Sequence, residues 1–214
     1  MLLLFCHFGP VIFHGYFFAY EDRKEVNMYK KNIHSLVLSG MLAVIALILS
    51  YFSFAVPFLP PFLKFDFTFI PLFIALLLMG YKEALLVSFM KNLLHFILIS
   101  SEPTGIIANL VVEFIFLTIM FFAYKQKTNS RVVIGGLTAT VSITIFMSLL
   151  NYFVLLPAYG YILNLTDIVN NVKVIVTVGI VPFNILKGIL VTFLFFISLR
   201  IYNAVPSSIK NRFI

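Results

Sequence analysis

Amide and ammonium groups lie inside the apolar stretches of this 214-residue chain. Asn184 and Lys187 belong to the last apolar segment, and their spacing puts them one helical turn apart on a shared face. Ionisable side chains are costly at membrane depth, so they usually face a bundle interior or a cavity. A carboxamide offers donors and acceptors without charge, which suits a neutral heterocycle or a polyol. This face therefore predicts a chamber for a small polar-aromatic molecule.

Two further asparagines, Asn109 and Asn151, are expected at a compatible depth in other apolar segments. For any one asparagine, a hydrogen bond between helices is an equally good explanation, because such bonds are common in membranes. The convergence of Asn109, Asn151 and Asn184 favours ligand binding for the set.

Lys91 and Glu113 flank an expected helical hairpin around Ser101 and Glu102. Antiparallel neighbours would place them within about 3 Å of equal depth, which predicts a structural ion pair. With His95 they could instead serve as acid–base groups of an intramembrane enzyme. The sequence has no phosphate-binding loop, no H-E-x-x-H, no Cys/His metal spacing and no nucleophile elbow. We therefore expect no catalytic residues, no metal site and no enzyme.

The composition identifies the class of protein that holds these groups. Hydrophobic residues make up 62% of the chain and charged residues only 11%, with a mean hydropathy of +1.08. The apolar runs are continuous and do not alternate, so helices are expected and a barrel is not. The sequence predicts an all-α integral membrane protein with six transmembrane helices, of which the second is too short to cross fully. The expected segments are Ile33–Val56, Phe67–Gly80, Glu83–Ile99, Pro103–Tyr124, Val132–Leu156 and Val172–Ile201.

The distribution of Lys and Arg predicts the orientation. Lys64 and Lys173 fall on one side of the membrane, Lys91 and Lys187 lie within segments, and all other basic residues fall on the opposite side. Both termini are therefore expected in the cytoplasm. This asymmetry also accounts for the net charge of +7, so no nucleic-acid partner is expected.

The connection between the first two segments carries aromatic and polar residues that could form a lid over the chamber. An interfacial aromatic belt is the alternative. The residues concerned are Leu63, Lys64, Phe65, Asp66, Phe67 and Thr68.

The first segment has a stripe of small residues along one face, where another helix could approach closely. The stripe could serve internal packing or dock a partner subunit. It consists of Ser39, Ala43, Ala46 and Ser50.

Three divisions of the chain are expected. Residues 1–27 are interrupted by Gly9-Pro10 and form a poor signal peptide and a poor span, so we interpret them as an extension outside the functional unit. Residues 28–205 are expected to form the six-helix substrate-binding domain, and 206–214 a cytoplasmic tail. Cys6 is the single cysteine, which excludes an internal disulfide.

Five motifs in order resemble the riboflavin-specific substrate-binding (S) component of energy-coupling factor (ECF) vitamin transporters. The resemblance covers about residues 29–205 and departs from the family pattern at Phe69, where an Asp is frequent. The motifs are Leu63-Lys64-Phe65-Asp66-Phe67-Thr68 with Ile70-Pro71; Lys91-Asn92-Leu93-Leu94-His95; Gly105-Ile106-Ile107-Ala108-Asn109; Asn151-Tyr152-Phe153 with Pro157 and Tyr159-Gly160; and Pro182-Phe183-Asn184-Ile185-Leu186-Lys187-Gly188.

This resemblance implies a multi-pass protein of a bacterial cell membrane that binds riboflavin as a transported ligand and carries no cofactor. It implies partners, namely a membrane coupling subunit and two ATPase subunits, and closure of the site by the lid. Asn151, Asn184 and Lys187 would contact the flavin ring, with Asn109 as a further candidate. An S component for another vitamin, such as thiamine or pyridoxine, and a purely structural membrane subunit remain alternatives.

Overall fold

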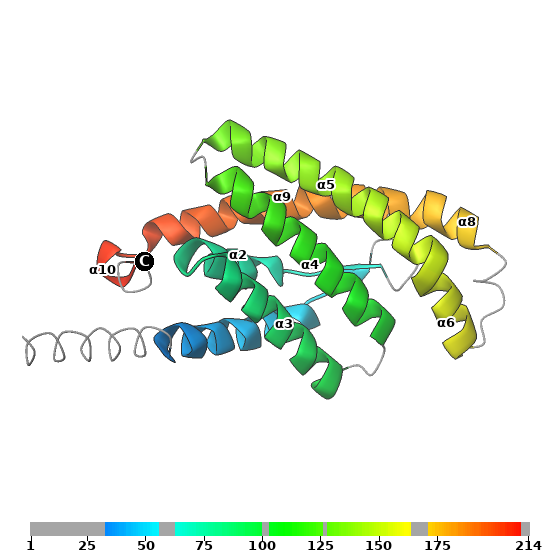
Figure 1. The fold of residues 1–214 in the computed structure, drawn as a ribbon, viewed down its shortest axis with the longest axis horizontal. Coiled ribbons are helices and arrows are strands. Elements are labelled where there is room, and N and C mark those ends of the chain that lie inside the picture. The colour runs from blue at the N-terminus through cyan, green and yellow to red at the C-terminus, as the bar shows by residue number, and fades with distance from the viewer. Residues whose placement is uncertain (1–32, 56–62, 100–102, 126–127, 164–170, 211–214) are drawn as a thin grey trace, which may run out of the picture.

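The computed structural model describes residues 33–55, 63–99, 103–125, 128–163 and 171–210, and these are almost entirely helical (Figure 1). The expected extension, residues 1–27, lies outside the described residues. Four helices are long and apolar enough to cross a membrane: Ile33–Tyr51, Thr104–Tyr124, Asn129–Ala158 and Val172–Ala204. The all-helical membrane class is confirmed.

Two of the six expected segments form helices that are either too short or too charged to join these four. The helix α2, Phe69–Leu78, has ten residues and is about 15 Å long. The helix α3, Tyr81–Leu98, is longer but carries Lys82, Glu83 and Lys91. Length therefore separates α2 from the four long apolar helices, and charged residues separate α3 from them.

The helix α2 is buried on almost every side, as expected for a helix that is apolar all round. Its aromatic side chains join it to its neighbours α4, Pro103–Tyr124, and α9, Val181–Ala204. The Phe69 ring meets Phe116 at a centroid distance of 5.7 Å, and the Phe73 ring meets Phe195 at 4.9 Å. A helix too short to span the membrane is thus held in place as the core of the bundle.

The last two long helices each contain a π-helical turn before a proline. Along the chain, α5 (Asn129–Leu150) runs through η1 (Asn151–Leu155) into α6 (Leu156–Leu163), which contains Pro157. Likewise α8 (Val172–Val174) runs through η2 (Ile175–Ile180) into α9, which contains Pro182. Proline cannot donate to the carbonyl one turn back, so the wider turn accommodates it without ending the helix. The fifth helix consequently continues past the expected end at Leu156.

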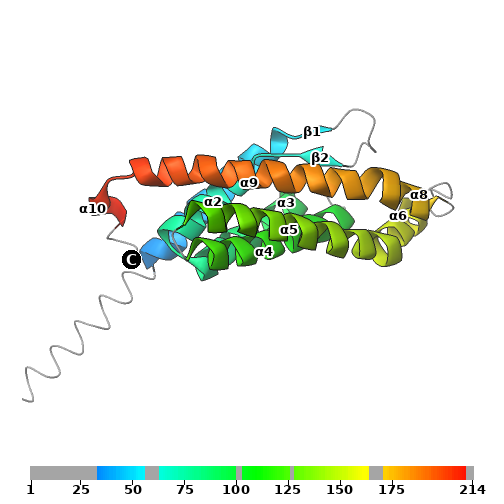
Figure 2. The same ribbon diagram turned by 90° about the horizontal axis from the view of Figure 1, so that it is seen from above.

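The first helix ends at Tyr51, before the expected Val56, and the chain then enters a short antiparallel hairpin. Strand β1, Phe54–Ala55, pairs with β2, Lys64–Phe65, with Phe54 opposite Phe65. This hairpin lies beside α9, on the side away from α4 and α5 (Figure 2). It was not expected from the sequence, and it forms the base of the predicted lid.

The stripe of small residues on the first helix points into the bundle. Ser39, Ala43 and Ala46 are fully buried, and the Ser39 hydroxyl has no hydrogen-bond partner among the described residues. This burial favours internal packing for these three residues. A role in docking a partner subunit stays a prediction.

The helices run alternately up and down (Figure 1), so four basic residues gather at one end, whereas Lys173 in α8 lies at the other end. Lys82 lies in the first turn of α3, Lys125 follows α4, Arg131 lies in the first turn of α5, and Arg200 lies near the end of α9. The short helix α10, Ser207–Lys210, is at this same end of the molecule (Figure 1). The end of α3, the beginning of α4 and the strands β1 and β2 belong to the other half.

Candidate ligand-binding site

A cavity of about 510 Å³ opens in the half of the bundle away from the basic end. This volume lies within the usual range for small-molecule sites. The walls are the end of the first helix, the hairpin β1–β2, the second half of α3, the beginning of α4, the region around η1, and the beginning of α9. The side chains with polar groups that line it are Ser50, Tyr51, Ser53, Lys64, Asp66, Lys91, His95, Thr104, Asn109, Asn151, Asn184 and Lys187.

Asn151 and Asn184 are held by the helices that carry them. Asn151 Nδ2 donates to the Met147 carbonyl and Asn184 Nδ2 donates to the Ile180 carbonyl, each at 2.8 Å. Both residues are buried and line the cavity. Among the described residues, neither Oδ1 accepts a hydrogen bond. The helix backbone thus orients each carboxamide and leaves its acceptor available to a ligand.

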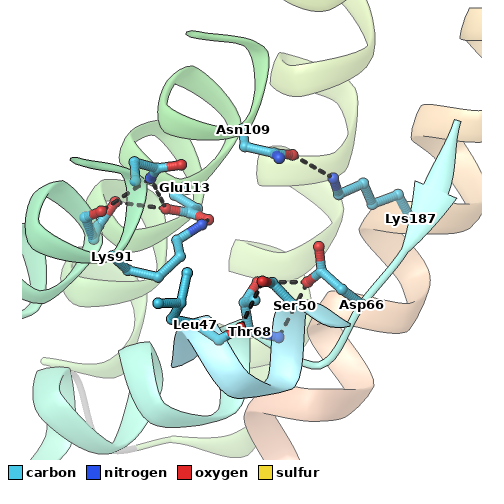
Figure 3. Close-up of polar contacts among 10 residues, drawn as sticks. Leu47, Ser50, Asp66, Thr68, Lys91, Asn109, Glu113 and Lys187 are labelled. Atoms are coloured by element: carbon cyan, nitrogen blue, oxygen red, sulfur yellow. Dashed lines mark hydrogen bonds and ion pairs between the residues drawn. The ribbon is translucent and has the colours of Figure 1, made fainter. Parts of the chain in front are cut away.

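Lys187 is buried without a carboxylate in ion-pair range among the residues that the structure describes. Its Nζ donates to Asn109 Oδ1 across a long 3.5 Å separation and lies 5.7 Å from the centre of the Phe183 ring. Figure 3 shows Lys187 on α9 and Asn109 on α4 pointing toward one another. A buried ammonium with so few partners is costly unless a ligand supplies an acceptor.

The predicted ion pair between Lys91 and Glu113 is present (Figure 3). Glu113 also accepts hydrogen bonds from Ser88 Oγ at 2.6 Å and from Asn92 Nδ2 at 2.7 Å, and Glu113 is almost fully buried. Three donors therefore hydrogen-bond to this carboxylate, and the Lys91 ammonium balances its charge. Lys91 lines part of the cavity wall, but its ammonium group is already paired with Glu113.

Asp66 forms a tight turn that leads into α2. Its Oδ1 accepts hydrogen bonds from the Thr68 backbone N–H at 3.0 Å and from the Thr68 hydroxyl. Figure 3 shows this turn below the Lys187–Asn109 contact. The same carboxylate lines the cavity, so Asp66 both fixes the start of α2 and presents a charge to the chamber.

The hairpin meets α9 through two phenylalanines. The Phe65 ring stacks on the Phe183 ring, with centroids 5.0 Å apart and an interplanar angle of 19°. Both side chains are buried. The Phe54 ring contacts Phe65 at 5.7 Å and Phe67 at 6.2 Å, which extends the aromatic cluster along the hairpin.

The residues predicted to bind the ligand fall into two groups in the structure. Leu63, Lys64 and Asp66 line the cavity together with Asn109, Asn151, Asn184 and Lys187. The other predicted lid residues support it instead: Phe65 covers Phe183, Phe67 meets Phe54, and Thr68 bonds to Asp66. Ser50, expected at a partner interface, lines the cavity and donates to the Leu47 carbonyl at 2.6 Å.

Several wall residues were not singled out from the sequence. Phe183 immediately precedes Asn184 in the last of the five motifs, and this position next to a candidate ligand contact is a signal for it in the sequence. Met147, Leu155 and Ile180 are ordinary apolar residues of long helices, and only the packing shows that they face the cavity. Ser53 and Thr104 also line the cavity, and no sequence motif distinguishes them from other serines and threonines.

The arrangement suits reversible binding of a flat, largely neutral molecule. Apolar walls with a few placed amides and one ammonium are typical of such sites. The described residues contain no cluster of three or more His, Cys, Asp and Glu side chains that could hold a metal ion.

Comparison with known proteins identifies the family. Residues 34–199 match the family model of the ECF transporter, substrate-specific component. The chain is 41% identical over 181 residues to the riboflavin transporter RibU of Staphylococcus aureus (strain TCH60), covering 84% of this chain and 95% of that protein. It is 35% identical over 168 residues to the riboflavin transporter FmnP of Bacillus subtilis (strain 168), covering 76% and 88% respectively.

A solved structure supports the same assignment. The S component of a bacterial ECF transporter superposes on this chain with a TM-score of 0.69 at 36% sequence identity. The match covers 80% of this chain and 96% of that one. The chain is therefore a multi-pass membrane protein that belongs to the substrate-specific components of ECF transporters.

Proposed function

We propose that this chain is the riboflavin-binding component of an ECF transporter. The observation that carries the proposal is the 41% sequence identity between this chain and a riboflavin transporter. The match covers 84% of this chain and 95% of that protein. The cavity supports it independently, because Asn151, Asn184 and Lys187 converge on one space of suitable size. The relatives are named as transporters, and the chain acts as a transport component and not as an enzyme.

The chemistry of riboflavin complements this cavity. The pyrimidine edge of the flavin mixes donors and acceptors, and it would meet the two oriented carboxamides and the ammonium of Lys187. The dimethylbenzene end is apolar and would lie against side chains such as Met147, Leu155 and Ile180. The ribityl chain is a neutral polyol, for which Asn109 and the polar groups near Asp66 offer hydrogen bonds.

The lid would close over the bound vitamin. Leu63, Lys64 and Asp66 reach the cavity, while Phe65, Phe67 and Thr68 hold the hairpin and its connection in place. Vitamins are scarce, so tight binding is expected, and nanomolar affinity corresponds to about −12 kcal/mol. Reopening a closed site of this kind requires energy from elsewhere, which fits a component that works with an ATP-driven ECF module.

We propose the cytoplasmic orientation of both termini from the described basic residues. Lys82, Lys125, Arg131 and Arg200 gather at one end, which is typical of the cytoplasmic side. The cavity lies in the opposite half and would receive the vitamin from outside. In this arrangement α2 and α3 complete a six-helix unit with the four long helices, within residues 28–205. Residues 1–27 and 206–214 would lie outside that unit.

The finer composition of the complex is also a proposal. The chain would assemble with a membrane coupling subunit and two ATPase subunits, since it has no phosphate-binding loop of its own. The outward face of the first helix is apolar and includes Leu36, Val37, Met41 and Ile48. This exposed face is compatible with lipid or with the coupling subunit, whereas Ser39, Ala43 and Ala46 are already covered.

Purification of the protein from cells grown with riboflavin tests this function. We expect the preparation to carry flavin absorbance, and the ligand-free protein to quench riboflavin fluorescence on titration. Thiamine and pyridoxine at the same concentrations should not displace the flavin. Displacement by either vitamin would assign a different substrate, and the absence of any vitamin binding would leave a structural subunit as the explanation.

A further inference from the structure

Two glycine–threonine contacts of the same kind join α5 to α9. A Cβ atom built on Gly188 would fall 2.6 Å from Thr140 Cβ, and one built on Gly136 would fall 3.0 Å from Thr192 Cβ. Each helix thus contributes one glycine and one threonine, four residues apart, and each threonine packs over the glycine of the other helix. The two backbones can approach this closely only because both glycines lack a side chain.

Each threonine is also fixed to its own helix. Thr140 Oγ1 donates to the Gly136 carbonyl at 2.7 Å, and Thr192 Oγ1 donates to the Gly188 carbonyl at 2.8 Å. These bonds hold the rotamer of each threonine, so neither side chain can turn away from the facing glycine. The contact therefore defines both the register and the separation of the two helices.

The contact adjoins the face of α9 that lines the cavity. At 3.6 residues per turn, Lys187 lies about 100° around the helix from Gly188, and Asn184 lies about 40° away and one turn along. Asn184 and Lys187 both line the cavity, and α5 leads directly into Asn151. A shift or rotation of α9 at Gly188 would consequently move two candidate ligand contacts relative to the third.

We propose that the reciprocal contact of Gly188 with Thr140 and of Gly136 with Thr192 positions Asn184 and Lys187 against Asn151 for ligand binding. The inference rests on the proposed riboflavin function, because riboflavin is the probe that reports the alignment. The four residues of the contact are positioning residues, and none of them lines the cavity.

The first test adds one methyl group at the contact. Gly188→Ala is expected to weaken riboflavin binding at least about tenfold, because α9 must move away from Thr140. Adding Thr140→Gly to this variant makes room for the methyl group and should restore affinity to within about threefold of the original protein. The matched control is Gly40→Ala on the first helix, where a Cβ meets nothing within 4 Å. That control should bind riboflavin normally.

A double-mutant cycle separates positioning from a general loss of structure. In the original protein, Asn184→Ala is expected to weaken binding about 5- to 150-fold. In the Gly188→Ala background the same change should cost less than about threefold, because Asn184 is already displaced. Should Gly188→Ala fail to fold, the cycle is run with Thr192→Ala, which loosens the contact without a clash and should give the same direction of coupling.

The outcomes are distinct for the two proposals. If the original protein and Gly40→Ala do not bind riboflavin, the proposed function fails. If both bind riboflavin and Asn184→Ala has the same effect in every background, the positioning role of the glycine–threonine contact is wrong.

Discussion

The ring of Phe65 in β2 lies nearly parallel to the ring of Phe183 in α9, with centroids 5.0 Å apart. Phe183 immediately precedes Asn184, and its ring also faces the ammonium of Lys187 at 5.7 Å. One aromatic contact therefore connects the base of the lid to the helix that carries two candidate ligand contacts. Release of the lid and release of the ligand are expected to be coupled through it.

Phe65→Leu should speed riboflavin release. Leucine keeps most of the apolar volume but loses the stacking, which is worth about 0.5–1.5 kcal/mol and corresponds to a roughly 2- to 12-fold faster dissociation rate. Stopped-flow fluorescence with excess competing ligand measures this rate. Phe193→Leu is the matched control, since Phe193 is an exposed phenylalanine of α9. Equal dissociation rates in both variants would exclude Phe65 from lid closure.

The sequence was sufficient to predict the helical segments and the Lys91–Glu113 ion pair, because both follow from the spacing of residues along the chain. Apolar run length predicts a helix, and equal depth in a hairpin predicts contact. The lone polar residues Asn109, Asn151, Asn184 and Lys187 were also recognisable, since polar groups stand out in apolar segments.

Other features depend on three-dimensional packing and were not predictable in this way. The hairpin pairs only two residues on each strand, too few to give a periodic pattern. The inward position of Ser39, Ala43 and Ala46 depends on which neighbour covers the first helix, and a stripe of small residues is compatible with either direction. The π-helical turns before Pro157 and Pro182 reflect how each helix accommodates a missing donor without breaking.

Asn184→Ala should weaken riboflavin binding by about 1–3 kcal/mol, because ligand groups would be left without a hydrogen-bond partner. Titration of the purified variant by fluorescence quenching measures the change. Asn203→Ala provides the control, because Asn203 is an exposed asparagine near the other end of the same helix. Unchanged affinity in Asn184→Ala would remove this residue from the site.

Lys187→Met should have opposite effects on stability and binding. Replacing a buried ammonium that lacks a carboxylate partner among the described residues with an apolar chain of similar length removes a desolvation cost, so the ligand-free protein should unfold at a higher temperature. Riboflavin binding should weaken, because the ligand loses a charged donor. Thermal unfolding in detergent, with and without riboflavin, measures both effects. A lower melting temperature of the ligand-free variant would contradict the interpretation that Lys187 has no carboxylate partner, which the described part of the chain supports.

Glu113→Gln should destabilise the protein by about 3–5 kcal/mol, because it leaves the Lys91 charge buried without its partner. The double variant Glu113→Gln with Lys91→Met removes both charges and should recover much of that loss. Thermal unfolding of the three proteins gives the comparison. A double variant no more stable than Glu113→Gln alone would show that the pair is not the source of the effect.

The most direct test of the account is a riboflavin titration of the ligand-free protein beside a variant that combines Asn151→Ala, Asn184→Ala and Lys187→Met. We predict saturable binding of one riboflavin per chain by the original protein, with a nanomolar dissociation constant, and a loss of at least about a thousandfold in the triple variant. Equal riboflavin affinity of the two proteins would contradict the assignment of this cavity as the binding site.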